Sequence, residues 1–95
     1  MQVIHRGRAR KFIQEHPDAR KPLHDWKQAV QESEWRNFPD VRRTFSTADW
    51  VEGKIVFDIK GNDYRSIAIA AFRNGKLYIR NVLTDDEYGR GDWKK

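Results

Sequence analysis

Apolar and polar residues alternate most regularly in the second half of the chain. Three runs rich in apolar residues, 55–59, 64–72 and 77–83, are separated by Gly61-Asn62 and Asn74-Gly75. Both dipeptides tolerate the positive φ angles that two-residue hairpin turns require. The pattern therefore predicts a three-stranded antiparallel meander.

Placing each dipeptide at the centre of its turn fixes the cross-strand register and, with it, the two faces of the sheet. Asp58 is then expected opposite Arg65. In the second hairpin the expected pairs are Arg73 with Lys76, Ile69 with Arg80, and Ile67 with Val82. One face is mostly apolar and carries Ile55, Phe57, Ile59, Tyr64, Ser66, Ala68, Ala70, Phe72, Leu77, Ile79, Asn81 and Leu83. The other is cationic and carries Lys60, Arg65, Arg73, Lys76, Tyr78 and Arg80 around Val56, Ile67 and Ile69.

The first half of the chain has helical spacing instead. A first helix of about two turns begins at Arg8 and stops before Pro17, because the residue that precedes a proline is disfavoured in the α conformation. A second helix is expected from an N-cap at Asp18 to about Trp35, with a buried stripe of Leu23, Trp26, Val30 and Ser33. A third, short helix is expected over residues 37–45 with Phe38, Val41 and Phe45 inward.

Short strands at residues 2–5 and at Trp50-Val51 complete the predicted elements. The first two helices are the best amphipathic segments available to cover the apolar sheet face. The chain is thus predicted to be a single α+β domain, residues 1–95, with two layers: N-terminal helices on one face of a twisted, mainly antiparallel sheet. This layout leaves the cationic face open.

Charge and composition narrow the function classes. The 19 Lys and Arg residues outnumber the 14 Asp and Glu residues, and the resulting net charge of +5 favours an anionic partner such as nucleic acid. The chain contains no cysteine, which excludes disulfides and thiol chemistry. No segment has the length and apolarity of a transmembrane helix or of a signal peptide. We therefore expect a cytoplasmic protein without a membrane partner.

Most residues with catalytic potential have simpler explanations. His5, His16 and His24 lack partners at metal-ligand spacing, and capping or surface roles suit them better. The run Asp85-Asp86-Glu87 is typical of a helix N-terminus rather than of a metal site. No phosphate-binding glycine loop is present. The sequence therefore predicts neither a metal nor a cofactor.

The remaining constellation is cationic and aromatic: Lys60, Arg65, Arg73, Arg80 and Tyr88. RNA can be cleaved without a cofactor when its 2′-OH attacks the adjacent phosphate and cationic side chains neutralise the additional charge. Tyr88 or Tyr78 could stack on a base or orient the 2′-OH. The chain after residue 87 is expected to fold back, so that Tyr88 lies over the sheet with Trp93 beside it. The alternative is an ordinary solvated sheet face.

Three segments give the chain a family resemblance. The strings VFDIKGNDYR (56–65), LYIRNVLT (77–84) and EYGRGDWK (87–94), with HPDA at 16–19, closely resemble the HigB toxins, RelE-like mRNA interferases of bacterial type II toxin–antitoxin systems. The resemblance implies a RelE-like fold, ribosome-associated mRNA cleavage and neutralisation by a HigA-type antitoxin with a helix-turn-helix domain.

The resemblance also implies site residues. The family's cationic residues correspond to Lys60, Arg65, Arg73 and Arg80, and its C-terminal tyrosine corresponds to Tyr88. With the predicted sheet face, this leads us to expect Lys60, Arg65, Arg80 and Tyr88 to be catalytic, and Asn62, Arg73, Lys76 and Tyr78 to bind RNA. Asn81 and Asp85 depart from similar sequences that often have histidine, which removes a candidate proton-transfer group. Two alternatives to a ribonuclease stay open: a non-catalytic RNA-binding module on the same basic face, and an interaction protein whose basic face receives an acidic partner segment.

Overall fold

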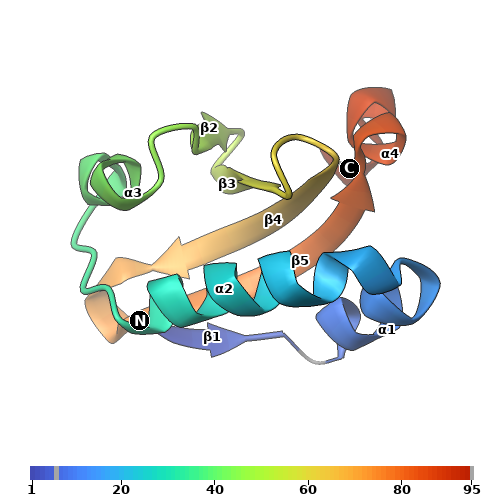
Figure 1. Cartoon of the computed structure of the whole chain (residues 1–95). Helices are drawn as coiled ribbons and strands as arrows, with labels where there is room; N and C mark the ends of the chain where they lie inside the picture. Colours follow the sequence, from blue (N-terminus) through green and yellow to red (C-terminus); the bar gives the residue numbers. More distant parts are fainter. Residues whose placement is uncertain (6, 95) are drawn as a thin grey trace.

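Five strands form one mixed sheet in the computed structural model, which describes residues 1–5 and 7–94 (Figure 1). The strands lie in the order β1-β5-β4-β3-β2, and β1 runs parallel to β5 whereas the other neighbours pair antiparallel. Their bounds are Gln2–Ile4 (β1), Asp49–Val51 (β2), Lys54–Ile59 (β3), Tyr64–Ala71 (β4) and Lys76–Thr84 (β5). The predicted meander and both short strands are confirmed.

The N-terminal helices cover the predicted apolar face of this sheet. The α-helices span Arg8–Glu15 (α1), Arg20–Gln31 (α2), Phe38–Thr44 (α3) and Asp85–Arg90 (α4), and three short 3₁₀ segments span Pro17–Ala19 (η1), Phe72–Asn74 (η2) and Asp92–Lys94 (η3). In Figure 1, α2 crosses in front of the sheet with α1 beside its N-terminal end. The two-layer α+β architecture is confirmed.

An aromatic cluster joins the helices to the sheet. The ring of Phe57 on β3 lies 5.1 Å from that of Trp26, 6.1 Å from that of Trp35 and 5.4 Å from that of Phe45. Leu23, Trp26 and Val30 of the predicted helical stripe are all buried. Packing of large aromatic rings supplies much of the apolar burial that holds a domain of this size together.

The second helix differs from the prediction at both ends. It ends at Gln31 rather than near Trp35, because Ser33 turns back and donates from its hydroxyl to the Ala29 carbonyl, 2.7 Å away. Trp35 is then free to stack on the core. Asp18 lies in η1 and does not cap α2, since its carboxylate binds other groups, described below.

The register of the first hairpin is confirmed, with Asp58 opposite Arg65, but that of the second is wrong. The strands stop earlier than predicted because η2 occupies residues 72–74, so Ile69 pairs with Tyr78 instead of Arg80, and Lys76 pairs with Ala71 instead of Arg73.

A β-bulge then shifts the ladder by one residue between Ile67 and Ala68. As a result Ile67 lies opposite Asn81 instead of Val82, and Leu83 lies opposite Arg65 on the face predicted to be cationic. Arg80 falls at the bulge and has no partner on β4. A bulge of this kind redirects side chains and inverts the faces beyond it.

The second face of the sheet is not open along its whole length. Val56 and Ile67 are buried under Trp93, with Leu83 and Tyr88 packed against them. The C-terminal segment therefore covers the part of this face near the β3–β4 turn. Within residues 1–5 and 7–94, no helix combines the length and apolarity needed to span a membrane.

Candidate functional site

Tyr88 is held against the second sheet face by the C-terminal segment. Thr84 caps α4 and forms a capping box with Glu87, so the acidic run 85–87 is confirmed as a helix N-terminus. After α4 the chain turns at Gly91, whose φ of 77° is in the left-handed region that glycine adopts easily. Trp93 then stacks on Tyr88, with ring centroids 5.3 Å apart and 13° between the planes, and donates from Nε1 to the Tyr88 carbonyl at 3.0 Å.

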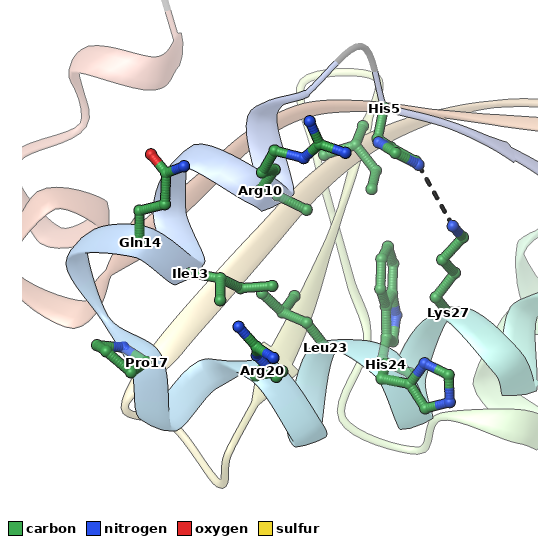
Figure 2. A pocket seen from close by; sticks show the side chains of 12 residues that line it. His5, Arg10, Ile13, Gln14, Pro17, Arg20, Leu23, His24 and Lys27 are labelled. Atoms are coloured by element: carbon green, nitrogen blue, oxygen red, sulfur yellow. Dashed lines mark hydrogen bonds between the residues drawn. The ribbon is translucent and has the colours of Figure 1, made fainter.

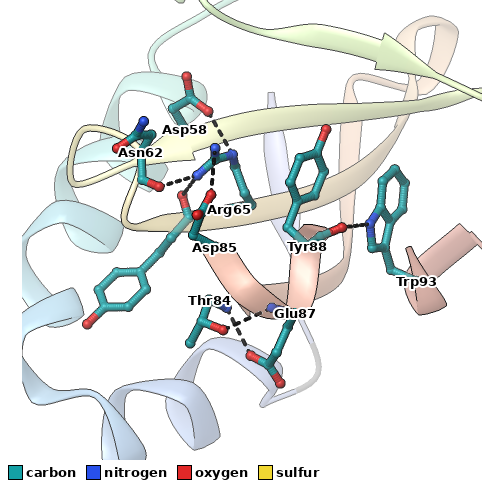
Figure 3. A network of polar contacts seen from close by, with 9 residues as sticks. Asp58, Asn62, Arg65, Thr84, Asp85, Glu87, Tyr88 and Trp93 are labelled. Carbon is teal, nitrogen blue, oxygen red and sulfur yellow. Dashed lines mark hydrogen bonds and ion pairs between the residues drawn. The ribbon is translucent and has the colours of Figure 1, made fainter. Parts of the chain in front are cut away.

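The guanidinium of Arg65 lies over the ring of Tyr88, 5.0 Å from its centroid (Figure 3). In Figure 3 the tyrosine ring stands between Arg65 and Trp93. A cation and an indole thus restrict the orientation of the ring from two sides. This arrangement confirms that Tyr88 folds back over the sheet with Trp93 beside it.

Most donors of Arg65 are already engaged. Its guanidinium contacts a carboxylate oxygen of Asp58 at 3.0 Å and one of Asp85 at 3.1 Å, and it donates to the Asn62 carbonyl. The Arg65 side chain is only 12% exposed, so it is largely shielded from solvent although the cationic face was predicted to be open. An arginine fixed by two carboxylates has little remaining capacity to bind a phosphate.

Lys60 belongs to a separate cluster. Its backbone has a φ of 54°, and its ammonium contacts Asp18 at 3.0 Å and Asp63 at 3.5 Å. The hydroxyl of Tyr64 donates to the same Asp18 carboxylate at 2.6 Å. Because Tyr64 packs on Phe12 of α1, this cluster lies on the helix side of the sheet, and the prediction that Lys60 shares a face with Arg65 is wrong.

The hydrogen bonds of this cluster shift three pKa values. Donation from Tyr64, and secondly from Lys60, lowers the pKa of Asp18. The bond to the Asp18 carboxylate raises the pKa of Lys60 and that of Tyr64. Each shift favours the state in which Asp18 is ionised, Lys60 is charged and Tyr64 keeps its proton.

Arg80 lines a hollow of about 300 Å³ between α1 and the C-terminal half of β5, together with Arg8 and Lys11. Glu15 and Glu87 also line it, and one carboxylate oxygen of Glu87 is occupied by the capping box. Arg80 is exposed, and no carboxylate among the described residues lies within ion-pair distance of it. Its donors are therefore available to an anion.

The predicted RNA-binding residues do not lie together. Arg73 is in η2 and Lys76 begins β5, so both lie at the opposite end of β4 from Asn62 and Arg65. The seven residue steps from Tyr64 to Ala71 span about 23 Å at the usual rise of a strand. Tyr78 lies between the two ends and shares a hollow with Ile4, Ile69 and Arg80. The cations thus extend along the molecule rather than converging on one atom.

Arg8 and Lys11 are candidate site residues that sequence reasoning missed. Their three-residue spacing places them on one side of α1, which is visible in the sequence, but every exposed helix has such pairs. What brings them to Arg80 is the packing of α1 against β5, which no local pattern encodes.

Comparison with known families identifies the chain. Residues 19–91 match the HigB_toxin family, described as the RelE-like toxic component of a toxin-antitoxin system. No curated protein matches this chain. The match covers most of the sequence, including strands β2 to β5, α4 and Tyr88. Among the described residues, the four α-helices and the five-stranded mixed sheet agree with a RelE-like fold. The chain therefore belongs to the HigB toxins of toxin–antitoxin systems.

Proposed function

We propose that this toxin is an endoribonuclease that cleaves mRNA on the ribosome and so inhibits translation in the cytoplasm. The observation that carries the proposal is the fixed ring of Tyr88, held between Arg65 and Trp93 at the end of the second sheet face. A phenol in a defined orientation suits contact with the reacting 2′-OH. Membership of a RelE-like toxin family supports ribonuclease activity in general.

In the proposed reaction the 2′-OH loses its proton to solvent and attacks the adjacent phosphate. The bond to the 5′ oxygen breaks, and this oxygen takes a proton from solvent. The products are a 2′,3′-cyclic phosphate and a 5′-OH end. Tyr88 contacts the 2′-OH, and Arg80 neutralises the charge that develops on the phosphate oxygens, because its guanidinium has no carboxylate partner among the described residues. No cofactor is needed.

Arg65 then acts through Tyr88. Its donors are occupied by Asp58, Asp85 and the Asn62 carbonyl, so we assign it to positioning the tyrosine ring rather than to phosphate binding. Asp85 stands where similar sequences often have histidine. Its ion pair with Arg65 gives it a supporting role in the same arrangement.

The other predicted site residues lie away from Tyr88, and we assign them structural or RNA-binding roles. Lys60 fixes the β3–β4 turn against the helix layer through Asp18. Arg73 and Lys76 lie at the far end of β4 from Arg65, and Tyr78 lies between the two ends, so we assign these three residues to contacts with neighbouring nucleotides or with the ribosome. Phosphate contacts of this kind add affinity without adding sequence preference.

A second candidate function is non-catalytic RNA binding on the same face. The engagement of Arg65 by two carboxylates favours it, because fewer free cations surround Tyr88 than a cleavage site would use. The same basic surface would then bind mRNA without breaking it.

Induced expression in a bacterium with mapping of mRNA 5′ ends tests the proposal. We expect growth arrest and new 5′-OH ends inside translated reading frames, with matching 2′,3′-cyclic phosphates. Growth arrest without new ends would support the binding module instead. A purified reaction with and without ribosomes then shows whether cleavage depends on translation.

A further inference from the structure

A row of three half-buried side chains crosses the second face of the sheet. Ile4 of β1 pairs with Tyr78 of β5, and Tyr78 pairs with Ile69 of β4. The residues beside them in the sequence lie instead in the core under the helices: Val3, Ala68, Leu77 and Ile79. Because side chains alternate along a strand, the row lies on the opposite face of the sheet from that core.

This is also the face on which Tyr88 packs. Ile67 and Ile69 are two residues apart on β4, and β4 alternates regularly because the extra residue of the bulge, Arg80, is on β5. Ile67 belongs to the apolar cluster that Tyr88 packs against. The row therefore extends the face of the proposed site beyond the part that the C-terminal segment covers.

The charged side chains at the row are basic. The row lines a hollow of about 370 Å³ together with Arg8 and Arg80, and no Asp or Glu among the described residues lines it. Arg8 and Arg80 also line the neighbouring hollow between α1 and β5, so the two hollows adjoin. Neither arginine lies within ion-pair distance of a carboxylate in the part of the chain that the structure describes. A flat apolar group that carries an anion is complementary to such a surface.

The cations of α1 are divided between two sides of that helix. Arg10 lines the groove between α1 and α2, in the helix layer, and Figure 2 shows it there. Arg8 and Lys11 line the hollow with Arg80 instead. The packing of α1 on β5 thus adds Arg8 and Lys11, but not Arg10, to the cations beside the row.

We propose that Tyr78, between Ile4 and Ile69, is the platform on which one base of the RNA stacks, while Arg8 and Arg80 bind the phosphate next to that base. The row spans two strand spacings, about 10 Å, which is wide enough for one base. Tyr78 and Arg80 are two residue steps apart, at most about 7 Å along β5, a separation that one nucleotide can span. A second copy of the chain fits less well, because it would add its own cations to the same interface.

The platform rests on the proposed action on RNA, but its test does not depend on cleavage. A single-stranded 2′-O-methyl RNA cannot be cleaved by its 2′ oxygen. Its Kd is measured, with and without ribosomes, for the intact RNA and for a series in which each member lacks one base. For the parent protein, removal of one particular base should weaken binding about tenfold, because aromatic stacking contributes strongly for any base.

Variants at Tyr78 locate the contact. Tyr78→Leu keeps an apolar side chain in the row, and it should bind the intact RNA about tenfold more weakly and be insensitive to loss of that base. Tyr78→Phe keeps the ring and should behave like the parent, and melting curves check that both variants are folded. If the parent's Kd depended on no single base, or if Tyr78→Leu kept the parent's dependence, the proposal would be overturned.

Variants at the arginines separate the phosphate contact from the stacking contact. Arg8→Gln should weaken binding by the same factor, about threefold or more, for the intact RNA and for each RNA that lacks a base. The matched control Arg43→Gln lines neither hollow and should bind like the parent. Absence of new mRNA ends together with base-dependent binding through Tyr78 would sink the ribonuclease proposal and leave the platform standing. Cleavage without that dependence would do the reverse.

Discussion

Arg65 and Arg80 lie on neighbouring strands, yet their surroundings differ completely. Arg65 is enclosed by Asp58, Asp85 and the ring of Tyr88, whereas Arg80 stands exposed at a β-bulge beside two more cations. Two arginines of one sheet thus have different roles. A guanidinium whose donors are occupied fixes geometry, and one whose donors are free can bind a phosphate.

The largest expected effect is from Arg80→Ala. If Arg80 neutralises the phosphate, its removal should lower mRNA cleavage about 10²–10³-fold, the usual cost of losing one electrostatic stabiliser of a transition state. The melting temperature should stay unchanged, because no ion pair is lost. Arg43→Ala, another exposed arginine, is the matched control and should cleave normally. A large fall in melting temperature for Arg80→Ala would make the residue structural.

Tyr88→Phe should follow, with cleavage reduced about 10²-fold at unchanged stability. The ring and its contacts with Arg65 and Trp93 are kept, and only the hydroxyl is lost. Cleavage assays and melting curves for Tyr88→Phe and Tyr88→Ala decide between the roles. Full activity of the phenylalanine variant, with instability only in the alanine variant, would mean that Tyr88 merely packs.

The sequence predicted the elements well because their signals are local. Alternating apolar residues and Gly61-Asn62 determine the first hairpin, and its register was right because its turn has the predicted length. The acidic run 85–87 and the position of Trp93 beside Tyr88 were likewise legible, since capping and short-range packing depend on neighbouring residues.

The errors arose where distant parts of the chain decide the outcome. The bulge at Ile67/Ala68 allows Leu83 to pack beside Ile67 under the C-terminal segment. No local residue pattern predicts this bulge. Asp18 has the residue type of an N-cap, but its carboxylate accepts hydrogen bonds from Lys60 and Tyr64, which are 42 and 46 residues away in the sequence. For the same reason the cationic residues predicted to form one site are divided among four places: the surroundings of Arg65, those of Lys60, those of Arg80, and the far end of β4 with Arg73 and Lys76.

Arg65→Lys sharpens the contrast between the two arginines. The lysine keeps the charge but cannot contact Asp58, Asp85 and the Asn62 carbonyl together, so unfolding should become easier by about 2 kcal/mol. Cleavage should fall less than in Arg80→Ala, because Tyr88 is only misplaced. Asp58→Asn should have a smaller effect of the same kind. Denaturant unfolding and cleavage assays check both variants, and a stable but inactive Arg65→Lys protein would show that Arg65 itself contacts the RNA.

The smallest effect is expected from Asp18→Asn, which tests whether Lys60 is structural. Hydrogen bonds from Tyr64 and then Lys60 lower the pKa of Asp18, so the stability it contributes is present above the ordinary carboxyl pKa and is lost as the pH falls through the lowered value. The melting temperatures of parent and variant should therefore differ slightly at pH 7 and converge well below pH 4. Tyr64→Phe is the matched control, since it removes the largest cause of the shift while keeping the ring on Phe12. If Asp18→Asn leaves stability unchanged at pH 7 but abolishes cleavage, Lys60 acts in the reaction rather than in the turn.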